Sequence, residues 1–498
     1  MRKLVGFISL GCAKNRVNTE QMMFLLRKAG YIVSGEVDGA DVVVLNTCGF
    51  VNSAKSEAID NILELAELKG RGIIGKLVVA GCLAQRHKDD ILSEMPEIDA
   101  VVGTGSFDEI VSVVDELVQV KHGDSPSAKN SPQASREPCA SCDPHASQAS
   151  RDPRASRDPR ASRDPRASRD PQASLEPQAS RQISVFGDIS APVSETGRIL
   201  STSSVWAYLK IAEGCNNRCA YCCIPDIRGS FRSRNMENIL NEARELVDTG
   251  VKELILVAQD STSYGVYLYG KRSLTKLLRE LSTIENLLWI RILYLYPNEI
   301  DDELIDEISK SDKIVKYLDI PIQHISDNIL SKMNRRGTGD EIRSLLKKLR
   351  ERIDGLVLRT SVITGLPGEG DEEFNELYEF LKEYKIERTG VFAYSPEEGT
   401  PAALMERPSE QIAEQRADLI YQLGDEILKD FDKHRIGSVT TVLTEAEDES
   451  GILRARSYAE SPDVDGYITI VGNNAKPDTF ADIRLIGVED GELIGETL

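Results

Sequence analysis

Short apolar runs alternate with longer stretches of helical spacing along the first 121 residues. The apolar runs occupy residues 4–10, 41–45, 76–80 and 99–102. Between the first two runs, Met22, Leu25, Leu26 and Ala29 repeat at the i, i+3, i+4 and i+7 positions of one helix face, and Gly30 ends the repeat. Continuous apolar strands that alternate with amphipathic helices are typical of a parallel sheet covered on both faces. We therefore predict a doubly wound α/β domain over residues 1–121.

The same alternation resumes after residue 199. Candidate strands lie at residues 205–211, 253–258, 288–295, 317–320, 356–363 and 390–394. This succession of strand and helix units predicts a partial (β/α) barrel over residues 199–432, which ends in a helix over residues 408–432. In residues 433–498, short β-prone segments separated by Gly, Pro, Asn and Asp predict a small β-barrel. The expected fold class is α/β with a closing β-barrel.

Residues 122–198 separate the two α/β domains and differ from them in composition. The hexapeptide Ala-Ser-Arg-Asp-Pro-Arg occurs three times in succession over residues 149–166. With a proline in each repeat and no hydrophobic face, this segment cannot bury enough apolar surface to offset the entropy of ordering it. We predict a disordered linker. Cys139, Cys142 and His145 lie within it, and without a fourth ligand a metal site there is not favoured.

Three cysteines follow the first predicted strand of the central domain. Cys215, Cys219 and Cys222 have C-x3-C-x2-C spacing. A structural zinc site has four ligands, and a simple electron-transfer iron–sulfur cluster is likewise held by four cysteines. Three thiolates would leave one iron open to a small molecule, which indicates catalysis. The alternatives are a zinc site completed by the adjacent Cys223, or buried unreactive thiols.

A second set of three cysteines follows strands of the N-terminal domain. Cys12, Cys48 and Cys82 each stand just after a predicted strand. Ligands of doubly wound sheets bind outside the carboxyl ends of the strands, so we expect these cysteines to converge there. Each alone would be better explained as a buried structural thiol. Together they predict a second cluster with one iron unfilled.

The charge of the chain bears on its partners. The net charge is −21, from 60 Lys and Arg against 81 Asp and Glu, and residues 434–498 contain five basic and thirteen acidic residues. Nucleic-acid binding depends on clustered Lys and Arg, so binding of tRNA is not expected, whereas a basic protein partner is compatible with this sign.

The cellular location also follows from the sequence. No apolar run of about 18 residues could span a bilayer, and no signal peptide precedes the first strand, so we expect a cytoplasmic protein without a membrane partner. In such a chain, nine cysteines favour metal or redox chemistry over a disulfide framework.

The spacing of the central triad, with Tyr221 before its last cysteine, resembles the signature of the radical S-adenosylmethionine (SAM) enzymes. Residues 9–20, Ser-Leu-Gly-Cys-Ala-Lys-Asn-Arg-Val-Asn-Thr-Glu, resemble the opening motif of the methylthiotransferases. The Lys-Asn-Arg-Val form and residues 456–462 look most like the branch that modifies a ribosomal protein rather than tRNA. The C-terminal segment resembles the TRAM module. The resemblance is interrupted by residues 122–198, because members usually join the two domains by a shorter connection.

The resemblance implies a methylthio transfer to the β-carbon of one aspartate of small-subunit ribosomal protein uS12. Two 4Fe-4S clusters and SAM would be the cofactors, and an electron donor such as flavodoxin or ferredoxin would be a partner. The cluster of the central triad would cleave SAM to a 5′-deoxyadenosyl radical, which abstracts the hydrogen. The cluster of the N-terminal triad would present the sulfur, already methylated by a second SAM. The alternatives are a tRNA adenosine methylthiotransferase, which would share both triads, an iron–sulfur electron carrier and a zinc-stapled binding protein.

Polar or glycine-rich segments also follow other predicted barrel strands, at the end where barrel enzymes gather their chemistry. The turn formed by residues 365–369 resembles the family element that lies against the methionine and ribose of SAM. The candidate cofactor-binding residues are Tyr221, Gln259, Gly365, Pro367 and Glu369. The alternative for residues 365–369 is an ordinary strand-to-helix turn.

One histidine and three arginines also lie near these segments. A single histidine in a turn is more often structural than catalytic, and we expect this of His324. Arg228, Arg232 and Arg234 follow the central cysteine loop. They either contact the SAM carboxylate or a substrate, or form a solvated face.

Overall fold

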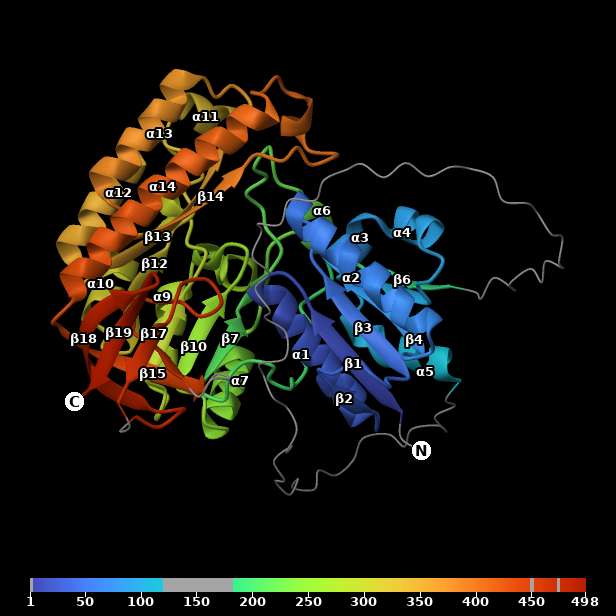
Figure 1. Cartoon of the computed structure of the whole chain (residues 1–498). Helices are drawn as coiled ribbons and strands as arrows, with labels where there is room; N and C mark the ends of the chain where they lie inside the picture. Colours follow the sequence, from blue (N-terminus) through green and yellow to red (C-terminus); the bar gives the residue numbers. More distant parts are fainter. Residues whose placement is uncertain (1–2, 120–181, 448–451, 473–474) are drawn as a thin grey trace, which may run out of the picture.

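The computed structural model describes residues 3–119, 182–447, 452–472 and 475–498. These residues form two parallel sheets with flanking helices and a closed β-barrel (Figure 1). The hexapeptide repeat and Cys139, Cys142 and His145 lie outside the described residues. Among the residues described, every helix is too short or too polar to span a lipid bilayer.

The N-terminal sheet has six parallel strands in the order β2-β1-β3-β4-β5-β6. They are β1 (Leu4–Ser9), β2 (Ile32–Ser34), β3 (Val42–Thr47), β4 (Lys76–Gly81), β5 (Ala100–Val102) and β6 (Ile183–Val185). The order reverses between β1 and β3, and ligands of doubly wound sheets bind at that position. The predicted doubly wound sheet is confirmed.

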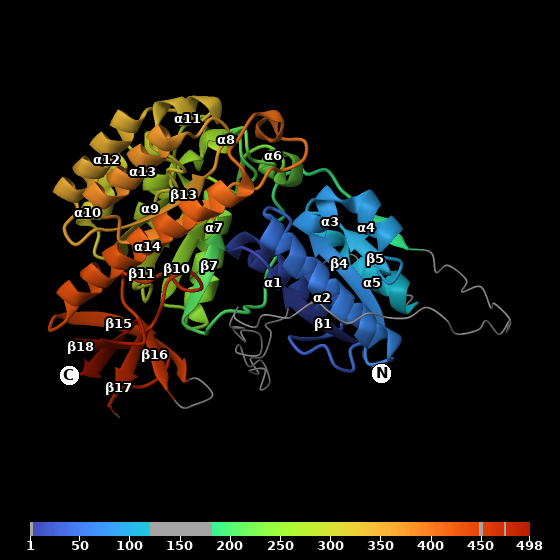
Figure 2. The same cartoon turned by 45° about the horizontal axis from the view of Figure 1, so that its top comes forward.

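Helices cover both faces of this sheet (Figure 2). Alternate strand residues point to opposite faces, so Val44 packs with α1 (Ala13–Lys28) and α5 (Ile110–Val118). Leu45 packs on the other face with α2 (Asn52–Gly70), α3 (Cys82–Arg86) and α4 (Lys88–Glu94). The sheet therefore separates two hydrophobic cores.

The structure corrects the predicted linker at its C-terminal end. β6 lies within residues 122–198, yet it pairs in parallel with β5, with Ala100 opposite Ile183. Further along, Arg198 forms an ion pair of 3.1 Å with Glu20 of α1. Residues 182–198 are thus an ordered part of the N-terminal unit. A three-residue strand at the edge of a sheet is too short to show a periodic pattern in the sequence. β2, which also has three residues, was missed because it is equally short.

The central sheet is an open, parallel, six-stranded sheet in which the strands lie in chain order. They are β7 (Trp206–Lys210), β10 (Glu253–Val257), β11 (Trp289–Ile292), β12 (Ile314–Asp319), β13 (Val357–Thr364) and β14 (Arg388–Ala393). The main helices on its outer face are α7 (Met236–Asp248), α9 (Leu274–Ser282), α10 (Asp302–Lys310), α12 (Gly339–Arg352), α13 (Asp371–Tyr384) and α14 (Glu410–Arg435). The predicted partial barrel is confirmed.

The C-terminal unit is a closed barrel in the order β15-β16-β17-β19-β18. Its strands are β15 (Val439–Glu447), β16 (Leu453–Arg456), β17 (Ile468–Val471), β18 (Phe480–Glu489) and β19 (Glu492–Thr497). This barrel packs on the concave face of the central sheet, where its Leu443 and Ala459 join a core with Tyr208, Tyr317 and Val17 of α1. Both flanking units therefore cover the inner face of the partial barrel.

Candidate active site

Three strand ends of the N-terminal sheet bring Cys12, Cys48 and Cys82 to one edge. Cys12 precedes α1, Cys48 follows β3 and Cys82 begins α3. Gly11, with φ of +87°, lies so close to Cys48 that a Cβ atom on it would stand 2.7 Å from the Cys48 Cβ. A Cβ on Gly49 would stand 2.8 Å from the Leu83 Cα. Only glycine fits at these positions, so the three cysteine loops pack directly against one another.

The electrostatics of this triad fit a metal cluster. Burial raises the pKa of Cys48 to about 11, helped by the neighbouring Cys82 and Cys12. Burial also raises the pKa of Cys82. Cys12 is the exposed member of the triad. Desolvation by the surrounding protein raises the pKa of its thiol, but the positive charges of Lys14 and Arg228 lower it by more, so the pKa of Cys12 lies below its usual value. Three soft sulfur donors that resist joint ionisation fit a bound cation such as iron, which would stabilise the thiolates.

The central triad lies in the loop between β8 (Ala212–Glu213) and α6 (Ile224–Arg228). The backbone of this loop is tied to the barrel, because the Ala220 N–H donates to the Met333 carbonyl at 2.9 Å. Arg335 Nη1 lies 3.8 Å from the Cys219 Sγ. Burial raises the pKa of Cys215 to about 11 and that of Cys222 well above its usual value. This donor set also fits a cluster.

The described residues contain no group of three His, Cys, Asp or Glu side chains close enough to ligate a single metal ion. In an iron–sulfur cluster each cysteine binds its own iron, so the sulfur atoms stand farther apart than around one ion. In the described residues, the cysteines therefore do not gather around one ion position, as the zinc site considered for Cys223 would require.

Cys223 joins the two triads. It is 3% exposed and packs in one small apolar cluster with Cys82 and Ile227, against which Phe50 also packs. Arg86 Nη1 donates to the Cys223 Sγ at 3.1 Å. The residue that follows the last cysteine of the central triad therefore belongs to the same apolar cluster as a cysteine of the N-terminal triad.

Arg228 spans the same seam between the domains. Its guanidinium donates to the Cys82 Sγ at 3.2 Å, to Asn15 at 3.1 Å and to Asn18 at 2.9 Å, and it pairs with Glu213 at 3.3 Å. The side chain is 2% exposed. Although burial lowers the pKa of Arg228, Cys82 and Glu213 raise it above its ordinary value.

The expectation of a solvated arginine face is wrong. Arg232 donates to the Arg228 carbonyl at 3.1 Å, and Arg234 forms ion pairs with Glu195 and Glu242 at 2.5 and 2.6 Å. All three arginines are buried and do not face water. Arg228 and Arg234 bond to residues of the N-terminal unit, whereas Arg232 bonds within its own segment.

Two of the candidate cofactor residues lie beside the central triad. The Tyr221 hydroxyl accepts a hydrogen bond from Arg335 at 3.2 Å. Gln259 Nε2 donates to Glu213 at 2.8 Å, while its Oε1 is buried and has no hydrogen-bond partner in the described part of the chain. That free acceptor is available to a ligand donor.

The turn after β13 contains the other three. Leu366 of this turn packs with Tyr221, Cys219 and Cys222, so the turn lies beside the central loop. The Glu369 carboxylate is fully buried, where it accepts from the Gly365 N–H at 2.9 Å and from Arg416 at 2.8 Å. Its other oxygen, Oε2, is buried and has no hydrogen-bond partner in the described part of the chain. Pro367 lines a cavity of about 680 Å³ together with Arg407 and Arg416.

His324 is completely buried, accepts a hydrogen bond from the Ser326 N–H at 3.0 Å, and lies 3.4 Å from Glu369. These contacts agree with the structural role expected for it.

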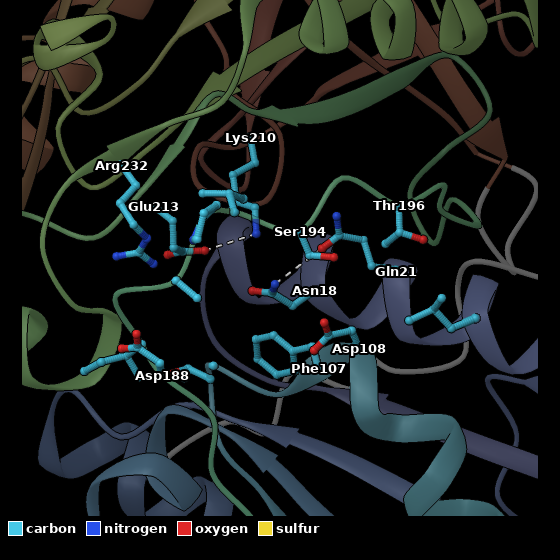
Figure 3. A pocket seen from close by; sticks show the side chains of 17 residues that line it. Asn18, Gln21, Phe107, Asp108, Asp188, Ser194, Thr196, Lys210, Glu213 and Arg232 are labelled. Carbon is cyan, nitrogen blue, oxygen red and sulfur yellow. Dashed lines mark hydrogen bonds and ion pairs between the residues drawn. The ribbon is translucent and has the colours of Figure 1, made fainter. Parts of the chain in front are cut away.

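A small polar cavity of about 100 Å³ lies on the seam between the domains (Figure 3). Asn18 and Gln21 of α1 line it from one side, and Lys210, Glu213 and Arg232 line it from the other. Glu213 was missed in the sequence, although an acid placed directly before Gly214 and Cys215 at the end of an apolar run was a signal for it. Burial raises the pKa of Glu213, but Arg228 and Lys210 lower it to about 2.

Comparison with known proteins agrees with this arrangement. The radical SAM superfamily matches residues 209–381, the uncharacterized protein family UPF0004 matches residues 4–103, and the TRAM domain matches residues 436–498. The chain is 43% identical over 505 residues to "Ribosomal protein uS12 methylthiotransferase RimO" of Acetivibrio thermocellus, which covers 100% of this chain and 99% of the relative. The relative of the same name from Caldicellulosiruptor saccharolyticus is 39% identical, with 99% of each chain covered. The chain belongs to the RimO family of methylthiotransferases.

As a RimO-family member, the chain is a radical SAM enzyme, and its cofactors are SAM and 4Fe-4S clusters. Among solved structures, the radical SAM methyltransferase TsrM of Kitasatospora setae is 15% identical, with a TM-score of 0.53 over 83% of this chain and 78% of that chain. This likeness extends to the fold alone.

Proposed function

We propose that the chain attaches a methylthio group to the β-carbon of an aspartate of ribosomal protein uS12. The observation that carries the proposal is the apolar cluster shared by Cys223 and Cys82, which brings the two cysteine-bearing loops to one seam. Forming a carbon–sulfur bond at an unactivated carbon needs a radical source and a sulfur donor at adjacent sites. Acid and base side chains alone cannot remove such a hydrogen.

Each triad would hold one 4Fe-4S cluster. Cys215, Cys219 and Cys222 would ligate the SAM-binding cluster, and Cys12, Cys48 and Cys82 would ligate the sulfur-carrying one. When bound, these groups and SAM supply a radical that removes a hydrogen atom and a methylated sulfur that replaces it. The chain's own residues shape the space around them and limit the access of water.

Other residues are proposed to position SAM. Gln259 offers its free Oε1, and Tyr221, Gly365 and Pro367 border the same end of the barrel. The carboxylate of Glu369 supports the Gly365 turn from behind. We assign residues 1–121 and 182–198 to the sulfur-carrying domain, residues 199–432 to the radical SAM domain and residues 433–498 to the TRAM-like barrel.

The choice of substrate is supported by charge. Residues 434–498 carry five basic and thirteen acidic residues, which disfavours a grip on RNA phosphates and is complementary to a basic ribosomal protein. The curated relatives carry uS12 in their names. The enzyme would then act in the cytoplasm and take electrons from a carrier such as flavodoxin or ferredoxin.

The test uses the intact enzyme, purified without oxygen and supplied with iron, sulfide, SAM and a reductant. Offered uS12 and tRNA separately, it should add one methylthio group to an aspartate of uS12, as seen by mass spectrometry of peptides. Methylthio-adenosine in the tRNA, with unmodified uS12, would establish the tRNA-modifying alternative. As a control, the triple variant Cys12→Ala, Cys48→Ala, Cys82→Ala should still cleave SAM but transfer no methylthio group.

A further inference from the structure

Lys14 is a buried lysine whose ammonium group forms no ion pair with a carboxylate in the described part of the chain. It lies in the first turn of α1, two residues after Cys12, and is 7% exposed. Its Nζ stands 3.5 Å from the centre of the Tyr294 ring and 3.5 Å from the Ala258 carbonyl oxygen. An ammonium group has three donors, and here they are engaged by a long contact with Ala258 and by Tyr294, while the Cys12 thiol is close enough to interact with the charge.

Burying an ammonium group without a carboxylate partner costs free energy, because the charge loses its hydration and buried charges are normally paired. By contrast, another buried lysine at the seam has a carboxylate partner. Lys210 is 2% exposed, and its Nζ lies 3.1 Å from Glu213. Glu213 is in turn engaged by Arg228 and Gln259, so it is not left over for Lys14.

The position of Lys14 matches that of a substrate-binding group. Ala258 follows β10 and Tyr294 follows β11, so both lie at the carboxyl ends of barrel strands, where barrel enzymes bind substrates. Tyr294 has φ of +62°, a conformation that non-glycine residues rarely adopt, and its N–H donates to Asp319 at 3.0 Å. Lys14 therefore reaches from the domain of one triad into the barrel rim beside the other.

We infer that Lys14 binds the carboxylate of the substrate aspartate and thereby holds its β-carbon between the two triads. This inference rests on the proposed function and adds the residue that selects an acidic side chain. A carboxylate is the ligand that best suits a buried ammonium group without a carboxylate partner, because the two form a charge-assisted hydrogen bond. A nucleobase or an amide offers no such charge, so the same contact excludes them.

The inference is tested by binding, without turnover. The cluster-loaded enzyme, with SAM but no reductant, is titrated with a fluorescent uS12 peptide that contains the modified aspartate, and with the same peptide carrying asparagine there. The wild-type enzyme should prefer the aspartate peptide by about 10- to 100-fold, the range of one hydrogen bond to a charged group. Lys14→Met should lower the affinity for the aspartate peptide to that for the asparagine peptide, with bound iron and the visible spectrum unchanged. Lys14→Arg, which retains the charge, should keep part of the preference.

Lys28→Met is the matched control, because Lys28 lies on the same helix and is exposed. It should behave as the wild type. An undiminished preference in Lys14→Met, or equal loss of both peptides together with loss of iron, would overturn the inference, since the lysine would then serve the cluster or nothing at the site. A wild-type enzyme that neither binds nor modifies uS12 would instead refute the proposed function.

Discussion

Replacing Glu460 by glutamine should loosen the C-terminal barrel from the central domain. Glu460 lies in residues 456–462, and its carboxylate accepts hydrogen bonds from Arg388 of β14 at 2.9 Å and from Arg435 of α14 at 2.6 Å. The Ser457 N–H and hydroxyl donate to its other oxygen at 3.0 and 2.6 Å. The side chain is 2% exposed. One buried carboxylate thus connects the barrel to the last strand and helix of the central domain.

The size of the effect follows from the pKa of Glu460. Burial raises this pKa, but Arg435 and Arg388 lower it by more, to about 2 from its ordinary value of 4.5. A lowering of that size corresponds to about 3 kcal/mol in favour of the folded, ionised state. Removing one partner of a buried ion pair costs about 3–5 kcal/mol in other proteins, which agrees with this value. We expect Glu460→Gln to lower the free energy of unfolding by about 3 kcal/mol at pH 7.

The dependence on pH has a definite sign. Because the folded pKa of Glu460 is depressed, its contribution is complete above the unfolded value of 4.5 and is lost as the pH falls towards about 2. The difference between wild type and Glu460→Gln should therefore be constant from pH 7 to about pH 5.5 and shrink by about 1 kcal/mol at pH 4.

Urea unfolding followed by tryptophan fluorescence is a suitable assay. The chain has two tryptophans. The guanidinium carbon of Arg456 lies 5.7 Å from the centre of the Trp206 ring. The rings of Trp289 and Phe480 pack edge to face, with their centres 4.7 Å apart. Both therefore report on the contact between the C-terminal barrel and the central sheet. Unfolding midpoints that coincide at pH 7, or a difference that stays the same down to pH 4, would refute this reasoning.

Three further changes test other parts of the structure. Arg228→Met should reduce the iron held at the N-terminal triad, because it removes the guanidinium 3.2 Å from the Cys82 Sγ. Iron analysis would show the loss, and electron paramagnetic resonance would show an unaltered central cluster. Full iron content in the variant would contradict this role of Arg228. Glu397→Gln removes the carboxylate that pairs with two cations of the N-terminal domain and should weaken the seam by about 1–3 kcal/mol, seen as faster limited proteolysis. A Gly/Ser linker in place of residues 120–181 should leave iron content and turnover nearly unchanged, whereas a deletion extended to residue 187 should destabilise the N-terminal sheet, because it removes β6.

The sequence predicted the parts of the fold that rest on local periodicity. The central strands and most of the N-terminal ones are continuous apolar runs. In the structure, helices cover both faces of the N-terminal sheet and the outer face of the central sheet, while the flanking units cover the inner face of the central sheet. The convergence of Cys12, Cys48 and Cys82 followed from topology, since the carboxyl ends of neighbouring parallel strands share one edge. Each of these cysteines has a glycine neighbour in the sequence, and the close approach of Gly11 to Cys48 requires one there.

The sequence could not predict the parts that depend on distant partners. Arg228, Arg232 and Arg234 form a polar stretch whose burial is decided by acids elsewhere in the chain, such as Glu213 and Glu195. An alternation of polar residues reads as a solvated face until those partners are placed. Glu369 was predicted to bind the cofactor, and the sequence does not show that Arg416, 47 positions later, would pair with its carboxylate.

The seam between the two α/β domains constrains how sulfur can reach the substrate. Domains joined by small, wet interfaces usually move relative to each other. Here Arg198, with a side chain 3% exposed, pairs with both Glu20 of the N-terminal domain and Glu242 of the central domain. Separating the domains would break these charge-assisted contacts. Cys223 and Cys82 lie in one apolar cluster at the same seam, so we expect the two cysteine-bearing loops to stay together during the reaction. We therefore expect the substrate chain to enter at the barrel rim without a closing movement of the two α/β domains.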